Sequence, residues 1–129
     1  MKTYVPEPFL SAYIDAALWS STYGENGEFP MDDGKHKLSD SAKKQMEAEC
    51  ADFLDYCEQS GINPFPDYAN PEFNDMELSG HDFWLTRNGH GAGYWERDLG
   101  EIGRKLTAVA KTFGRADLYI GDDGEIYQS

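Results

Sequence analysis

The chain has 129 residues, 40% of them hydrophobic and 14% aromatic, which suffices for the core of one globular domain and argues against a disordered chain. Asp and Glu number 24 against 11 Lys and Arg, so the formal net charge is −13, and a surface this acidic repels nucleic acid and anionic membranes. Most of the excess lies in residues 1–80, which hold 16 acids and 5 bases.

The first ten residues, MKTYVPEPFL, place prolines and an acid where the apolar region of a signal peptide would lie. No apolar run approaches the length of a membrane span. We therefore predict a cytoplasmic protein that does not engage a membrane.

Residues 6–21 predict the first helix. Their apolar side chains recur at helical spacing, and Pro8 suits a first turn because its missing N–H needs no partner there. Residues 22–37 contain three glycines and a proline without periodicity, which predicts a loop exposed to solvent. The predicted buried stripe of the helix consists of Leu10, Tyr13, Ile14, Ala17 and Leu18.

Residues 38–61 predict the second and longest helix, with Ser39 or Ser41 as the N-terminal cap and Gly61 at the C-terminal end. Its predicted core stripe is Ala42, Met46, Cys50, Phe53 and Cys57.

Asp52, Asp55 and Glu58 follow one another at three-residue intervals along this helix. They are candidate binding residues that would present a ladder of negative charge. A solvated helix face without a function is the alternative, because the repulsion between such charges costs only a few tenths of a kcal/mol.

Cys50 and Cys57 are separated by seven helical residues, or about 10 Å, which is too far for a disulfide. Both are predicted to be free thiols in a reducing compartment. Two thiols on one helix without a nearby histidine make a poor zinc site, so we predict no metal and no cofactor.

Three prolines in residues 62–79 predict an extended segment that packs Phe65, Tyr68 and Phe73 over the core. Residues 81–97, HDFWLTRNGHGAGYWER, then predict a β-hairpin, because Asn-Gly is a strong two-residue turn signal. This register pairs Arg87 with His90 and His81 with Glu96. A longer loop centred on residues 89–91 would change these pairs.

Residues 97–114 predict the third helix, with Asp98 and Glu101 as a capping box and Gly114 at its end. Residues 116–129 predict a second hairpin that turns at Asp123-Gly124. The expected fold is α+β: three helices packed on one small antiparallel sheet made of two hairpins, in the order ααββαββ, within a single domain of residues 1–129.

In the predicted hairpin Trp84 and Trp95 share the face opposite the core stripe. Large amphipathic side chains of this kind are enriched at protein interfaces, so both tryptophans are candidate binding residues, together with Arg87 and His90 of the same hairpin. The alternative is that both tryptophans pack beneath the helices.

A catalytic alternative uses His81, Glu96 and Arg87 as a hydrolase or nucleotide-modifying site. In the hairpin His81 and His90 lie about 20 Å apart, so they cannot form one dyad or bind one metal. The sequence also lacks a nucleophile elbow, a phosphate-binding loop and metal-ligand spacing. We therefore favour a protein that is not an enzyme.

The segment HDFWLTRNGHGAGYWERDLG, followed by a predicted helix and DLYIGDDGEIY, resembles a family of small acidic proteins encoded by bacteriophages and related mobile elements. The resemblance covers roughly residues 80 to 127, with a weaker match at FLSAYIDAALWSS. It implies an accessory protein in the cytoplasm of a bacterial host, and it transfers no catalytic residue.

The sequence leads to three hypotheses. The first is a non-enzymatic phage-type protein that binds a host or defence protein with a basic surface, in part by imitating the charge of DNA. The second is the small enzyme around His81. The third is a structural, self-associating phage component, and the sequence leaves the oligomeric state open.

Overall fold

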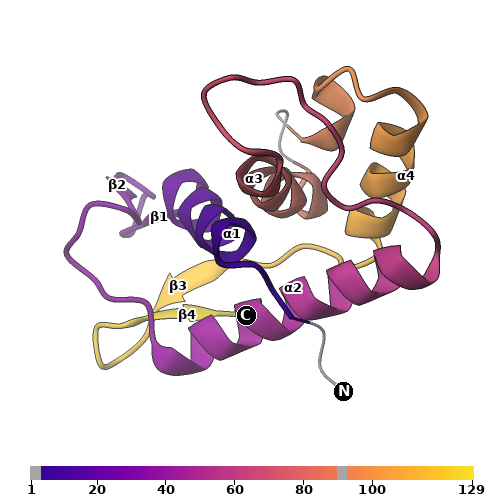
Figure 1. Ribbon diagram of the computed structural model, residues 1–129. Coiled ribbons are helices and arrows are strands. Elements are labelled where there is room, and N and C mark those ends of the chain that lie inside the picture. Colours follow the sequence, from indigo (N-terminus) through magenta and orange to yellow (C-terminus); the bar gives the residue numbers. More distant parts are fainter. Residues whose placement is uncertain (1–3, 90–92) are drawn as a thin grey trace.

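The computed structural model describes residues 4–89 and 93–129. Four α-helices and two small two-stranded sheets are present in this part of the chain (Figure 1). The helices are α1 (Glu7–Ser20), α2 (Asp40–Gln59), α3 (Asp75–Arg87) and α4 (Gly100–Lys111), with a short 3-10 helix η1 (Tyr94–Glu96). The strands are β1 (Thr22–Tyr23), β2 (Phe29–Pro30), β3 (Leu118–Ile120) and β4 (Ile126–Gln128).

The long helix α2 runs along one side of the molecule, with α1, α3 and α4 beside it and the β3–β4 hairpin near its N-terminal half (Figure 1). The mixed α+β character is as predicted, but three helices on a common sheet is wrong. Each sheet is one isolated hairpin, with β1 paired to β2 and β3 paired to β4. The predicted sheet cannot form because the segment expected as its first hairpin contains α3.

Helix α3 has clear end signals. The side chain of Asn74 caps its N-terminus by accepting a hydrogen bond from the backbone N–H of Glu77, and Asp75 adds a negative charge to the first turn. Asn88 and Gly89 are the residues that follow the helix, and Gly89 has a φ of 73°. The Asn-Gly pair therefore ends a helix here and does not turn a hairpin.

The segment looked like a strand because α3 is surrounded on nearly all sides. Eight consecutive or nearly consecutive residues are buried, so no amphipathic stripe at helical spacing marks the helix. The Asn88-Gly89 pair, a common two-residue hairpin turn, then favoured two strands over one helix. The buried residues are Ser79, Gly80, Asp82, Phe83, Trp84, Leu85, Thr86 and Arg87.

The other three helices lie within the predicted segments, although in α1 only Leu10, Tyr13 and Ala17 of the predicted stripe are fully buried, and Ile14 and Leu18 are partly buried. In α2 the hydroxyl of Ser39 accepts a hydrogen bond from the N–H of Ala42, Gly61 follows at a φ of 71°, and the five predicted core residues are buried. Both cysteines are free and buried. The capping box of α4 is wrong: Asp98 has a φ of 56°, and Leu99 caps the helix without a side-chain hydrogen bond.

The C-terminal hairpin is confirmed, with Ile120 opposite Ile126 and Gly124 at a φ of 83° in the turn. The loop of residues 22–37 contains the short β1–β2 hairpin and buries Met31. The extended segment is only partly as predicted, because it ends at α3 and leaves Phe73 51% exposed.

Stacked aromatic rings join the helices in the core. Phe83 of α3 lies 4.0 Å from Phe53 of α2 and 5.0 Å from Tyr13 of α1, measured between ring centroids. Phe113, just beyond α4, meets Phe83 edge-on at 5.2 Å. Helix α3 is thus the central element of the core.

Candidate functional site

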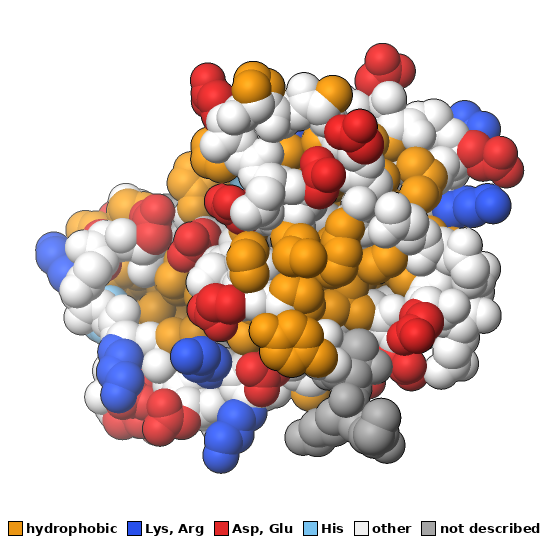
Figure 2. All heavy atoms as spheres, viewed as in Figure 1, with side chains coloured by type: hydrophobic (Ala, Val, Ile, Leu, Met, Phe, Trp, Pro, Cys, Tyr) orange, Lys and Arg blue, Asp and Glu red, His pale blue; other side chains and the backbone are white. Residues whose placement is uncertain are grey.

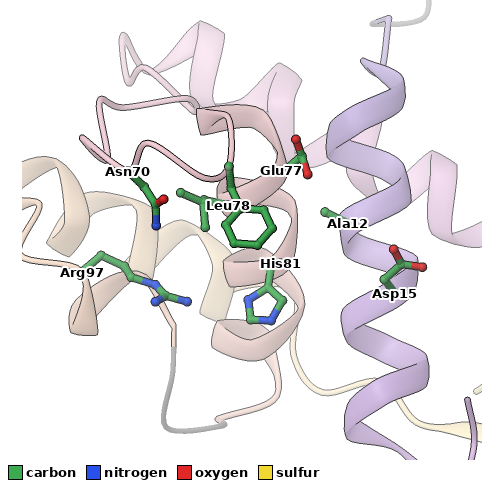
Figure 3. A pocket seen from close by; sticks show the side chains of 8 residues that line it. Ala12, Asp15, Asn70, Glu77, Leu78, His81 and Arg97 are labelled. Atoms are coloured by element: carbon green, nitrogen blue, oxygen red, sulfur yellow. The ribbon is translucent and has the colours of Figure 1, made fainter.

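A pocket of about 370 Å³ lies where α1, the segment before α3 and α3 itself meet (Figure 3). Helical spacing explains its composition, since residues three and four apart share one face of each helix. Its lining residues are Ala12 and Asp15 from α1, Asn70 and Phe73 from the connecting segment, Glu77, Leu78 and His81 from α3, and Arg97 after η1.

One wall of the pocket is fixed by a buried ion pair. The carboxylate of Asp82 is fully buried and accepts hydrogen bonds from Nε of Arg97 at 3.1 and 3.2 Å and from Nη2 at 2.9 Å. The hydroxyl of Tyr68 donates a further hydrogen bond to Asp82 at 3.0 Å. Burial, together with the Asp82 charge, raises the pKa of Tyr68, so this hydroxyl stays protonated as a donor.

His81 lies beside this pair, and its side chain is 34% exposed. Its Nδ1 atom is buried, lies 3.6 Å from Oδ1 of Asp82 and has no hydrogen-bond partner among the described residues. Its ring also adjoins the indole of Trp19, with 6.1 Å between ring centroids. Figure 3 shows His81 and Arg97 next to one another, with Asp15 and Ala12 on α1 across the gap.

The open side of the pocket combines carboxylates with aromatic rings. Asp15 is exposed on α1, and Glu77 is half-buried on α3. Phe73 is 51% exposed and Trp19, one helical turn beyond Asp15, is 62% exposed. The lining of the pocket therefore combines negative charge with apolar surface, and its described residues do not include a nucleophile paired with a base.

Trp84 and Trp95 do not form the shared binding surface that the hairpin predicted. Trp84 is 1% exposed, and its indole N–H donates to the hydroxyl of Ser20 at 2.9 Å. Trp95 is 40% exposed in η1, where its indole N–H donates to Glu96 and Lys111 lies over the ring. The assumed hairpin register placed them together, whereas the helix turns Trp84 into the core.

Arg87 is a core residue that ties three helices together. Its guanidinium lies 3.2 Å from Glu49 of α2, and it donates hydrogen bonds to the hydroxyl of Tyr13 and to the carbonyls of Phe113 and Gly114. Only 3% of its side chain is exposed. Arg87 is therefore not accessible to a partner or a substrate.

The three residues of the catalytic alternative, His81, Glu96 and Arg87, do not lie together in one site. On α3 Arg87 follows His81 by six residues, about 9 Å along the axis and on a different face. Glu96 is exposed beside Trp95 and is not among the pocket residues. His90 lies outside the described residues.

The acidic residues of α2 are placed at the surface. Asp52 and Glu58 are exposed, and Asp55 is half-buried and accepts a hydrogen bond from the side chain of Gln59. Figure 2 shows many carboxylates on one face of the molecule around an apolar centre, with most of the visible Lys and Arg toward the lower left and upper right. These three residues remain candidate binding residues.

Sequence reasoning missed the association of Asp82 with Arg97 and Tyr68, because these residues come together only through the tertiary fold. A helical interpretation of residues 75–87 would have placed Glu77, Leu78 and His81 on one face, and this was the one signal available. Within residues 4–89 and 93–129 no three His, Cys, Asp or Glu side chains are arranged to hold a metal ion, and no helix is long and apolar enough to cross a membrane.

No family model, no curated protein and no solved structure matches this chain. The resemblance to small acidic phage proteins therefore stays a prediction.

Proposed function

We propose that this chain is a non-enzymatic binding protein whose acidic surface engages the basic surface of a partner protein. One observation carries the proposal: residues 45–86 contain ten acidic residues and no Lys or Arg. This stretch forms most of α2, the extended segment and nearly all of α3. Negative charge on this scale attracts a basic surface over several Å and speeds its association.

The arrangement of the charges supports this proposal. Within the acidic stretch, Asp82 is neutralised by Arg97 and Glu49 lies beside Arg87, so two of the ten carboxylates serve the core. Others, including Asp52, Glu58 and Glu77, lie at or near the surface of adjoining elements. In the context that the phage resemblance implies, the partner would be a host or defence protein that normally holds DNA or RNA.

The test is affinity capture from a bacterial lysate on the immobilised full chain, across increasing salt. We expect a discrete protein that elutes as salt rises, because screening weakens attraction between exposed charges. The triple variant D52N/D55N/E58Q should release the same protein at lower salt.

The matched control is E101Q/D117N/D122N, which removes three exposed charges outside the acidic stretch and should leave elution unchanged. Recovery of nothing by the folded wild-type chain at any salt concentration would refute the proposal. Equal loss in the two triple variants would show that net charge alone, and not this surface, governs binding.

A further inference from the structure

We propose that the pocket between α1 and α3 is a receptor site for one arginine side chain of the basic partner. This inference rests on the proposed function and adds the feature that the partner presents. Four observations lead to it: the size of the pocket, its charge, its exposed aromatic rings and the rigid wall that the Asp82–Arg97 ion pair fixes.

The size suits a single long side chain. At about 370 Å³ the pocket is at the small end of the range for ligand sites. Ala12 and Leu78 provide apolar surface from the two helices. The methylene groups of an arginine side chain would pack against such surface while its charged end stays near polar groups.

The charge of the pocket favours a cation. The Arg97 guanidinium is paired with Asp82, so these two charges cancel within the wall that this ion pair fixes. Asp15 and Glu77, on facing helices, add two negative charges, and neither forms an ion pair within the described residues. These carboxylates would repel an anionic ligand.

The aromatic rings favour arginine over lysine. Phe73 lines the pocket and Trp19 adjoins it through His81. A planar guanidinium stacks on aromatic faces and donates two parallel hydrogen bonds to a carboxylate, whereas an ammonium is a compact and strongly hydrated charge. Carboxylates beside exposed rings are the combination that a guanidinium recognises best.

The wall that contains Arg97 is held in place in the free protein, before a ligand binds. Asp82 is fixed by Arg97 and by the hydroxyl of Tyr68, and it belongs to the central helix of the core. A preformed wall lowers the ordering cost of binding. A partner's side chain would therefore enter a shaped site and not only an acidic surface.

The experiment uses the full chain and a pair of short peptides, acetyl-Gly-Arg-Gly-amide and its citrulline counterpart. Citrulline has nearly the shape of arginine without the charge. Each is titrated at millimolar concentration while the ¹H–¹⁵N spectrum is recorded, with the Trp19 and Trp95 indole signals as near and distant probes. We expect the arginine peptide to shift the Trp19 signal and the backbone signals of α3, and the citrulline peptide to shift neither.

Variants D15N and E77Q should each weaken arginine binding by up to about fivefold, which is the range for one solvent-accessible ion pair. The control D122N removes an exposed carboxylate from the turn between β3 and β4 and should leave the affinity unchanged. A thermal melt of each variant shows that it is folded, and F73A provides an independent test because it removes the ring and keeps the charge.

Equal shifts by the two peptides, equal weakening by D122N, or shifts confined to other parts of the surface would overturn the arginine site. If the lysate partner is still captured in any of these cases, the proposed function stands and only the pocket is excluded. If the arginine peptide binds in the pocket but no partner is captured, the pocket stands and the proposed function fails.

Discussion

Gly80 of α3 lies directly against the backbone of Phe9 in α1. A Cβ atom at Gly80 would overlap the carbonyl oxygen of Phe9, and its nearest three neighbours would all be backbone atoms of that residue. In an isolated helix the change from glycine to alanine would be stabilising. Here we expect G80A to lower the free energy of unfolding by about 1–3 kcal/mol, since a backbone cannot move aside as a side chain can.

Chemical denaturation measures this effect, and G61A is the comparison. Gly61 has a φ of 71° and no atom within 4 Å of a built Cβ, so G61A is expected to cost about 1–2 kcal/mol from backbone strain alone. A G80A protein as stable as the wild type would show that α1 and α3 do not approach this closely.

Removal of the Arg87 guanidinium should be severely destabilising. It leaves Glu49 without its ion-pair partner and removes donors from the hydroxyl of Tyr13 and from two carbonyls after α4. Breaking a buried pair in this way costs about 3–5 kcal/mol. We expect R87A to lose that much on urea denaturation, while R104A, at an exposed position of α4, should stay within about 0.5 kcal/mol of the wild type.

The two thiols should be protected in the native state. Burial raises the pKa of Cys57 from 9.0 to about 12 and raises that of Cys50 well above its ordinary value. Because the thiolate is the reactive form, we expect iodoacetamide at pH 8 to modify both residues in urea and neither in buffer. Rapid alkylation of the folded chain would contradict their burial.

The same shift predicts an alkaline loss of stability. The unfolded thiol of Cys57 ionises near pH 9 and the folded one only near pH 12, so the unfolding free energy should fall as pH rises through this interval. In C57A this contribution to the pH dependence of the unfolding free energy should be absent, although the variant is less stable at every pH. Denaturation curves at several pH values separate the two effects.

Tyr127 and Asp123 form a hydrogen bond in the C-terminal hairpin, with 2.6 Å between the hydroxyl and the carboxylate. This bond holds the pKa of Asp123 below its ordinary value and raises that of Tyr127 to about 12. We expect Y127F to raise the Asp123 pKa toward its usual value in an NMR titration. Any stability from this bond is present above the unfolded carboxyl's pKa and is lost as pH falls through the lowered one.

Tyr119 stacks beside Tyr127, whereas the hydroxyl bonded to Asp123 is that of Tyr127, so Y119F is the matched control. An Asp123 titration that is unchanged in Y127F, or changed equally in Y119F, would show that the hydroxyl does not set this pKa.

The elements with local signals could be predicted from the amino-acid pattern alone. Helix α2 has a serine cap, a stripe at helical spacing and a terminal glycine, and the C-terminal hairpin has an Asp-Gly turn between apolar residues. The free cysteines and the acidic surface also follow directly from residue identity and spacing. Such features depend on residues a few positions apart, so they can be predicted without the fold.

The helical state of α3 and the pocket beside it depend on how the helices pack together. A helix buried on nearly every side carries no amphipathic stripe, so its sequence was compatible with a strand until its neighbours were known. The pocket unites α1, the segment before α3 and Arg97, and the Arg97–Asp82 bond spans 15 positions of the chain. No local pattern encodes such a contact, because packing of the helices around Phe83 and Gly80 creates it.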